Sequence, residues 1–529
     1  MILTRIIGTL ALSAATAFAQ TKLTKANRYV VIESARVGEA KFQDGHPFLI
    51  SQPLVDYSSL RTLPVDNSND PVAQKIQTWF DEGTAAGNVG DCYENRDGNH
   101  SRLNLDRLQQ FAEIKYSEEF IAKKADFGAK LNIANDRPTI VNASLAMVNT
   151  AMARSMARLI LHNPEFNPQL YSFYRMGDII CYPEHNDYDR ADLFAVNTPY
   201  LIISQGSSGT DQPFMIAVAQ TLASFHPAVK ERLHQYGLIA PTVQMIMRWN
   251  YQGIGNAENY LTGAAHPTVF DSNKLNRDAM AEMAHNMKFG CLPPLALIKM
   301  IEEETPVNGV DYFDAGASEV LIDTPCAIGR IARSLDYTRT FRVSAADSLD
   351  VQKLPLSYHW RVLRGDESLI TITPLNEAKT EVEISVDYQP TTTVPDQPTM
   401  KSHRVDIGAF VDNGTYYSAP AFISIWYPPN EQRKYDRNER IESVTYLDPR
   451  DVGPTADLKL AYHKPWRDTF DYDGSQLTGW TRTMNNGDSY EFNAAGERTE
   501  SSWFSEDKVA PVTYEIETSS EGYQTVEFN

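Results

Sequence analysis

The spacing of hydrophobic residues changes along the chain, and the change divides it into regions. Between residues 141 and 306 apolar side chains recur with the period of a helix, and one helical face carries Phe214, Val218, Leu222 and Phe225. A following short helix should end at Gly237, because glycine is common just past a helix end. Further helices are predicted at 241–249, 274–288 and 293–304. We therefore expect an α-helical domain over residues 141–334, with the mixed segment 20–140 packed on it.

From residue 335 onward the period becomes two, which is the pattern of half-buried strands. The runs "TRTFRVSA", "LITITPL" and "EVEISVDY" alternate apolar and polar positions, and turn signals such as Asn413-Gly414 divide them. Several short strands with this spacing predict a β-sandwich over residues 335–428.

Part of this region resembles the polycystic-kidney-disease-type (PKD-like) immunoglobulin-like modules of extracellular proteins. The similarity rests on "LPLSYHWRVLRGD" (354–366), "LITITPLNE" and "YYSAPAFISI". In such modules a Tyr-x-Trp strand places its tryptophan in the core, and the matching residue here is Trp360. The usual Asp-Phe-Gly-Asp-Gly turn is replaced by Val-Leu-Arg-Gly-Asp. The resemblance implies an extracellular spacer or adhesion module that accompanies an activity rather than supplying one.

The last hundred residues are polar, aromatic and rich in turns. Three dipeptides predict successive hairpins: Asp473-Gly474, Asn486-Gly487 and Ala495-Gly496. Since lone hairpins are marginally stable, the region 429–529 should pack on the sandwich. The sequence thus predicts a multidomain α+β chain with an α-rich N-terminal region, an Ig/PKD-like sandwich and a hairpin-rich C-terminal tail.

The first residues predict the compartment. Arg5 precedes an apolar stretch, and Ala-Phe-Ala precedes Gln20, so residues 1–19 are typical of a signal peptide cleaved after Ala19. We therefore expect a secreted or periplasmic protein. No later apolar run is long enough to predict a membrane span. The net charge of -20 argues against nucleic acid as a partner, because phosphates would be repelled.

Four cysteines are present, and none forms a CxxC pair. In an oxidising compartment disulfides are expected, with three possible connectivities. Of these we favour Cys92 with Cys181 and Cys291 with Cys326.

The segment "SQGSSGTDQPF" (204–214) joins an apolar run to a helix, which is where phosphates or nucleophiles are often presented. A phosphate-binding loop would need lysine after Gly209, and a nucleophile elbow would need glycine where Thr210 stands. The chain also shows too few βα units for an α/β-hydrolase. A capped helix start explains the loop structurally. Ser207 and Ser208 stay as ligand-binding candidates, and a serine hydrolase that uses them is one alternative function.

Two other polar loops carry candidate residues. "CYPEHNDYDRAD" (181–192) offers His185 as an acid or base, and its carboxylates could ligate calcium; no other cofactor and no specific metal ligand is predicted. If 194–203 is a strand, this loop enters one end of it and the serine loop leaves the other. "YENRDGNHS" (93–101) offers Arg96 and His100 to a ligand. The structural alternatives are a solvated acidic loop for residues 181–192 and a bulged surface turn for residues 93–101.

The segment 247–271 has the composition of a sugar-binding cleft, in which rings stack on sugar faces and arginine pairs with acidic groups. Its ligand-binding candidates are Arg248, Trp249, Asn250 and Tyr260. With His185, Tyr251 and His266 could serve as base and acid in β-elimination from an acidic polysaccharide. An aromatic loop that covers the core is the structural alternative.

These candidates together favour a secreted protein that binds or degrades extracellular polysaccharide, by lyase- or glycosidase-like chemistry if it is an enzyme. The alternative from a different class is a non-catalytic surface or adhesion protein. If the first interpretation holds, the candidates of segment 247–271, His185 and the serine loop should share one cleft.

Overall fold

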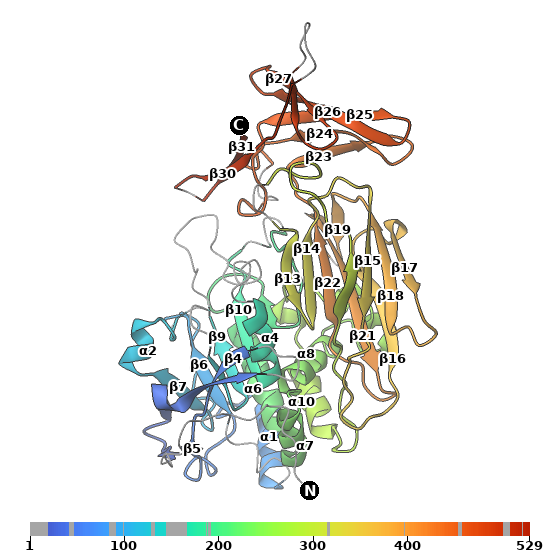
Figure 1. The fold of residues 1–529 in the computed structure, drawn as a ribbon. Coiled ribbons are helices and arrows are strands. Elements are labelled where there is room, and N and C mark those ends of the chain that lie inside the picture. The colour runs from blue at the N-terminus through green and yellow to red at the C-terminus, as the bar shows by residue number, and fades with distance from the viewer. Residues whose placement is uncertain are drawn as a thin grey trace.

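The computed structural model describes residues 20–41, 47–83, 91–98, 100–127, 133–143, 167–186, 188, 192–314, 318–395, 397–452, 457–500, 508–520 and 522–529. It shows a multidomain chain of helices and several sheets, with an N-terminal α/β region, a two-sheet β region and a C-terminal sheet (Figure 1). The proposed signal peptide, residues 1–19, lies outside the described residues.

Six parallel strands form the central sheet of the N-terminal region, in the order β11-β10-β9-β6-β7-β2. They are β2 (Tyr29–Ile32), β6 (Cys92–Asn95), β7 (Ala112–Tyr116), β9 (Thr139–Asn142), β10 (Asp178–Pro183) and β11 (Leu201–Ser204). Strands such as "TIVN" and "LIIS" are buried throughout, so they show no alternation of apolar and polar positions. The prediction of an α-helical domain with a separate segment packed on it was therefore wrong, because one parallel sheet combines strands from both predicted regions, β2, β6, β7 and β9 with β10 and β11. The expectation of too few βα units was wrong for the same reason.

Small sheets flank this core. One is formed by β3 (Val37–Lys41), β4 (Pro47–Ser51) and β8 (Ile133–Asn135), and another pairs β1 (Thr21–Lys22) with β5 (Val55–Asp56).

The strands β6 and β10 carry Cys92 and Cys181, which lie two strands apart. All four cysteines fall within the described residues and all four are free thiols, so the predicted disulfides are absent from the structure.

The helices cover the sheet and lead to the sandwich. They are α1 (Pro71–Asp81), α2 (Glu118–Ala122), α4 (Asn167–Met176), α6 (Gln212–Ser224), α7 (Pro227–Gln235), α8 (Ile239–Trp249), α9 (Ala257–Tyr260) and α10 (Arg277–Asn286). The predicted helical face of α6 is buried, and Gly237 follows α7 with a φ of 65°. The helix predicted at 293–304 was wrong, since residues 299–303 form a strand.

Two sheets make up the middle region (Figure 1). One has the order β12-β15-β18-β17 and the other β13-β14-β22-β21-β16. The strands are β12 (Lys299–Glu303), β13 (Val320–Thr324), β14 (Ala327–Ile331), β15 (Thr338–Ser344), β16 (Ser357–Arg364), β17 (Ile370–Pro374), β18 (Glu381–Asp387), β21 (Arg404–Asp412) and β22 (Ala421–Trp426), with a small hairpin of β19 (Thr392–Val394) and β20 (Gln397–Ser402). The two sheets therefore begin before residue 335. Trp360 is 7% exposed, while the PKD-like resemblance stays a prediction.

The C-terminal region forms a seven-stranded antiparallel sheet in sequence order. Its strands are β23 (Glu431–Tyr435), β24 (Ile441–Tyr446), β25 (Trp466–Asp473), β26 (Gln476–Met484), β27 (Ser489–Asn493), β28 (Arg498–Glu500) and β29 (Lys508–Ala510), followed by a hairpin of β30 (Tyr514–Thr518) and β31 (Gln524–Phe528). The three predicted turns connect β25 through β28. This region has an apolar core of its own, which includes Trp466, Trp480 and Phe492.

Candidate functional site

The loops that follow β6, β10 and β11 meet at one edge of the parallel sheet. The Gly206 amide donates to Glu184 Oε1 at 2.5 Å, and the His185 amide donates to the Gly206 carbonyl at 2.8 Å. On the other side, the Gly209 amide donates to Ser101 Oγ at 2.6 Å. From the sequence, the loops of residues 181–192 and 204–211 meet only if the chain folds back, and the parallel pairing of β10 with β11 shows that it does. Carboxyl ends of parallel strands are the usual ligand side of such sheets.

This carboxyl edge carries exposed polar side chains above buried carboxyl groups. His100, Ser207 and Ser208 are exposed and His185 is partly exposed, whereas Glu184 and Asp211 are buried. His100 Nδ1 hydrogen bonds to the Asp97 carbonyl at 2.7 Å. Neither serine adopts the positive φ of a strained turn, so the loop lacks the backbone of a nucleophile elbow.

Asp211 is a buried carboxyl group of this edge with a strongly perturbed pKa. It precedes α6 at the N-cap position but makes no side-chain capping bond there. Burial raises the pKa of Asp211 to about 7, and the Ser101 hydroxyl and the Gly209 amide only partly oppose this rise. Near neutral pH the group is therefore shared between its neutral and charged forms.

Asp211→Asn is expected to stabilise the chain more at pH 8 than at pH 5. Since the folded pKa lies above that of an unfolded aspartate, stability is lost as pH rises through the folded value. One pKa unit corresponds to about 1.4 kcal/mol, so the variant should gain about 2 to 3 kcal/mol over wild type between these pH values. Urea denaturation measures this, with the exposed Asp473→Asn as control. An equal difference at both pH values would contradict the prediction.

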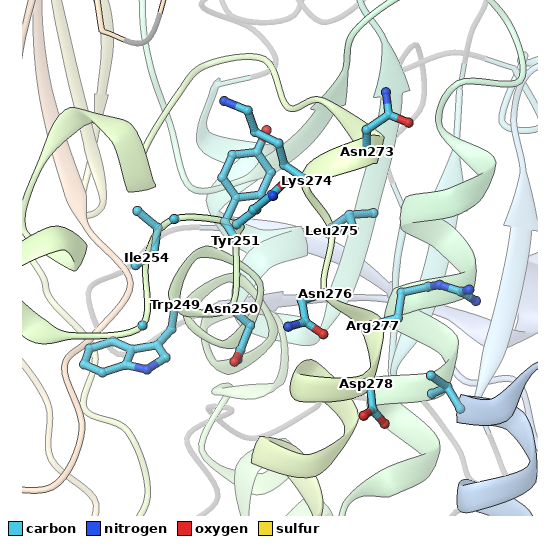
Figure 2. A pocket seen from close by; sticks show the side chains of 14 residues that line it. Trp249, Asn250, Tyr251, Ile254, Asn273, Lys274, Leu275, Asn276, Arg277 and Asp278 are labelled. Carbon is cyan, nitrogen blue, oxygen red and sulfur yellow. The ribbon is translucent and has the colours of Figure 1, made fainter.

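A groove lies beside this edge (Figure 2). Val72 and residues of the segment 249–278 line its larger part, whereas its smaller part reaches the sandwich through Pro395 and Gln397. The groove has two lobes, with volumes of about 630 Å³ and 280 Å³, which share Tyr251 and Lys274. The larger lobe is lined mainly by Trp249, Asn250, Gln252, Asn273, Asn276 and Arg277. The smaller lobe adds Tyr188, Gln205, Asp271, Pro395 and Gln397. We call this the interdomain groove.

Tyr251 forms the wall between the lobes. Its ring is 4% exposed, and Lys274 Nζ lies 5.7 Å from the ring centroid. The phenol oxygen accepts a hydrogen bond from the Asp271 amide at 2.8 Å and donates to the Asp271 carbonyl at 3.4 Å. The structure thus uses this hydroxyl to fix the loop.

Three other candidates of this segment are buried in the core. Arg248 donates to Gln244 Oε1 at 3.1 Å, and burial lowers its pKa to about 10. The Tyr260 hydroxyl donates to the Ser418 carbonyl at 2.7 Å, and His266 Nε2 hydrogen bonds to the Tyr260 carbonyl. Burial also lowers the pKa of His266. The predicted candidates therefore do not share one cleft, because α8 turns Arg248 inward.

Arg96 is buried as well, at the sheet's carboxyl edge. Its Nε lies 2.6 Å from Glu94 Oε1, and it donates to the Tyr116 hydroxyl at 3.1 Å. These contacts make Arg96 part of the sheet's internal ion pairing rather than an exposed anion-binding group.

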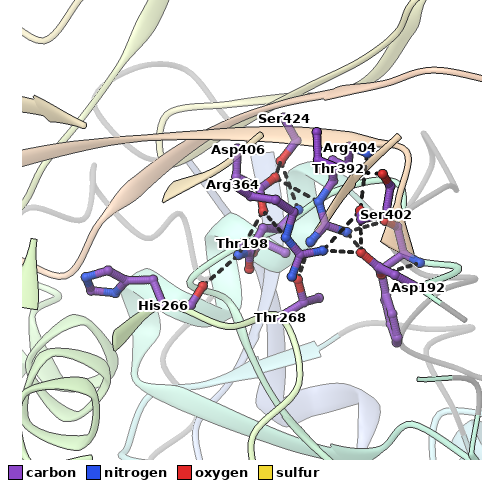
Figure 3. A network of polar contacts seen from close by, with 12 residues as sticks. Asp192, Thr198, His266, Thr268, Arg364, Thr392, Ser402, Arg404, Asp406 and Ser424 are labelled. Atoms are coloured by element: carbon purple, nitrogen blue, oxygen red, sulfur yellow. Dashed lines mark hydrogen bonds and ion pairs between the residues drawn. The ribbon is translucent and has the colours of Figure 1, made fainter. Parts of the chain in front are cut away.

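The sequence did not indicate the polar network that joins the two domains behind the groove (Figure 3). Asp192 pairs with Arg364 and lies 3.5 Å from Arg404, which bonds Asp406 at 2.8 Å. Although burial opposes ionisation, Arg404 and Arg364 hold the pKa of Asp192 below its usual value. Arg404 also donates to the Thr268 hydroxyl. The network therefore ties the wall near residues 267–269 to the sandwich.

Among the described residues, no group of three or more His, Cys, Asp or Glu side chains is arranged to hold a metal ion. Asp187 and Asp189, which belong to the calcium prediction, lie outside the described residues. In the same described part, no helix is both long and apolar enough to cross a membrane.

The fold defines a multidomain protein of mixed α/β architecture. The sequence matches no family model, and no curated protein matches it significantly. A solved structure that it matches is a nucleoside hydrolase-related hypothetical protein from Saccharophagus degradans, described as associated with carbohydrate metabolism. The identity is 10%, the match covers 64% of this chain and 100% of that chain, and the TM-score is 0.19. A likeness this weak supports no conclusion about fold or function.

Proposed function

We propose that the protein binds an extracellular polysaccharide in the interdomain groove. The observation that carries the proposal is the lining of the larger lobe, where the partly exposed Trp249 ring lies beside four side-chain amides, two cations and the Asp278 carboxylate. Secretion, predicted from residues 1–19, would place the groove where such polymers occur.

The chemistry of the lining suits sugar rings. Aromatic side chains offer apolar faces for the C–H groups of a pyranose, and they do so with little loss of conformational freedom. The exposed amide of Gln252 can both donate and accept, as sugar hydroxyls require, whereas the Asn250 NH2 group already donates to the Ile246 carbonyl at 2.9 Å. The smaller lobe reaches the sandwich through Pro395 and Gln397, and domain boundaries are a common place for ligand sites.

The contacts favour binding over β-elimination. The Tyr251 hydroxyl is engaged with the Asp271 backbone, and His266 is buried behind the groove. To act as base and acid on a bound sugar, the side chains of Tyr251 and His266 would both have to turn into the groove. The proposal thus agrees with a non-catalytic surface protein as well as with the predicted extracellular module.

Trp249→Ala is expected to weaken polysaccharide binding at least about tenfold, which is about 1.4 kcal/mol. Calorimetry of the purified chain against a panel of soluble neutral and acidic polysaccharides measures this, while assays for reducing ends and unsaturated products detect cleavage. Lys299→Ala, on an exposed strand of the sandwich, is the control, and thermal unfolding verifies each fold. The proposal fails if no polysaccharide binds, or if folded Trp249→Ala binds as wild type does.

A further inference from the structure

A row of three partly exposed rings leads from the groove onto the sandwich. Trp249 lies with its ring centroid 6.1 Å from that of Tyr417, with 24° between the planes, and Tyr417 lies 5.4 Å from His359. At 6.1 Å nearly parallel rings are displaced sideways, so that part of each face stays uncovered. We call these three residues the aromatic strip.

The strip crosses from one domain to the other. Trp249 ends α8 and lines the larger lobe, and Figure 2 shows it on the side of the groove away from Arg277. Tyr417 lies in the turn between β21 and β22, where it pairs with Asp412. His359 belongs to β16, whose alternation places His359 and the exposed Arg361 on the same face.

Arg361 extends the row beyond the last ring. Burial lowers the pKa of His359, and the Arg361 charge lowers it further, which keeps the imidazole neutral near pH 7. Burial raises the pKa of the Tyr417 phenol, and the charge of Arg361 partly opposes this rise. The three rings of the strip therefore continue the groove. The groove amides lie at the Trp249 end of the strip, and Arg361 lies at the His359 end.

We propose that the aromatic strip is a second subsite for the same ligand, so that the protein takes a long polysaccharide chain rather than a short sugar. The proposal rests on the proposed function of the groove. Its preferred ligand is an extended chain of pyranose rings with equatorial substituents, because such rings present axial C–H groups on both faces and can therefore lie on successive aromatic rings. One part of the chain occupies the groove, and the following rings lie over Tyr417 and His359.

The structural alternative is that the strip binds no ligand. In that case its rings only cover the apolar core beneath Tyr260, which lies 4.9 Å from Trp249 and 6.0 Å from Tyr417 between ring centroids. Removal of a ring would then change stability without any dependence of binding on the length of the ligand.

Binding of a graded series of oligosaccharides from the polysaccharide that binds best tests the proposal. For wild type, affinity should continue to rise with length after the groove is filled. Tyr417→Ala should remove this rise, with about a tenfold loss for the longest member and little change for the shortest that binds. Tyr417→Phe, which keeps the ring, should bind as wild type does. Thr415→Ala, exposed in the same turn, is the matched control.

The outcomes separate the two proposals. If wild type binds short and long members equally, or if folded Tyr417→Ala keeps the full rise with length, the strip is no subsite although the groove still binds sugar. If no member and no polysaccharide binds at all, the function proposed for the groove fails, and the inference about the strip fails with it.

Discussion

Asp192→Ala is expected to destabilise the protein by about 3 to 5 kcal/mol, because it leaves two buried guanidinium groups with one carboxylate. Arg364 and Arg404 are 4% exposed or less, and Asp406 alone would remain to neutralise them. The network joins the α/β region to the sandwich, so the substitution should also loosen the groove and weaken ligand binding. A multidomain chain unfolds in several steps, and the readout is therefore the midpoint of its first urea transition.

The double variant Asp192→Leu with Arg364→Met is the control for this effect. Removal of both charges leaves fewer unpaired groups, so it should be less destabilising than Asp192→Ala. Exposed ion pairs usually contribute less than about 1 kcal/mol to stability. If Asp192→Ala lowers the free energy of unfolding by no more than this, the network does not hold the two regions together.

Arg482→Ala should produce a loss of similar size in the C-terminal sheet, about 3 to 5 kcal/mol. Arg482 is fully buried, it donates to both Asp468 oxygens at 2.8 and 2.9 Å, and its guanidinium lies 4.1 Å from the Trp466 ring centroid. Lysine cannot reproduce this planar, two-pronged contact, so Arg482→Lys should fail as well. Near-ultraviolet circular dichroism in urea reports the loss, because Trp466 and Trp480 lie in the same core.

Arg467→Ala provides the matched comparison on the neighbouring strand. Arg467 is exposed, and its substitution should change stability by less than about 0.5 kcal/mol. Polysaccharide binding by Arg482→Ala should stay unchanged while its N-terminal domains are folded. An equal effect of both substitutions would show that the buried pair has no special role.

Local turn and periodicity signals predicted part of the fold. Hairpins turn where Gly474, Gly487 and Gly496 stand, and the apolar stripe of α6 is buried as its spacing indicated. The parallel strands were missed because both of their faces are covered, which removes the alternation that reveals a strand. In "KMIEE" the strand β12 was mistaken for a helix because a short apolar run fits either period.

The candidate site could be predicted only in pieces. Each loop of the carboxyl edge stood out by composition, but their meeting depends on strand order, which no local pattern contains. The segment 247–271 did contribute Trp249, Asn250 and Tyr251 to the groove. Tyr188 belongs to the candidate segment 181–192, but Gln397 comes from a distant strand and Lys274 was assigned to a helix, so the sequence did not single out these last two.

Hydrogen exchange of the purified chain, with and without its best polysaccharide ligand, tests the central claim most directly. Binding in the interdomain groove predicts slower exchange in peptides that cover residues 249–278, and in those around Tyr417 when the chain is long. Slower exchange confined to the loops of residues 97–101, 184–186 and 206–211 would contradict the groove as the binding site, and it would move the site to the carboxyl edge of the parallel sheet.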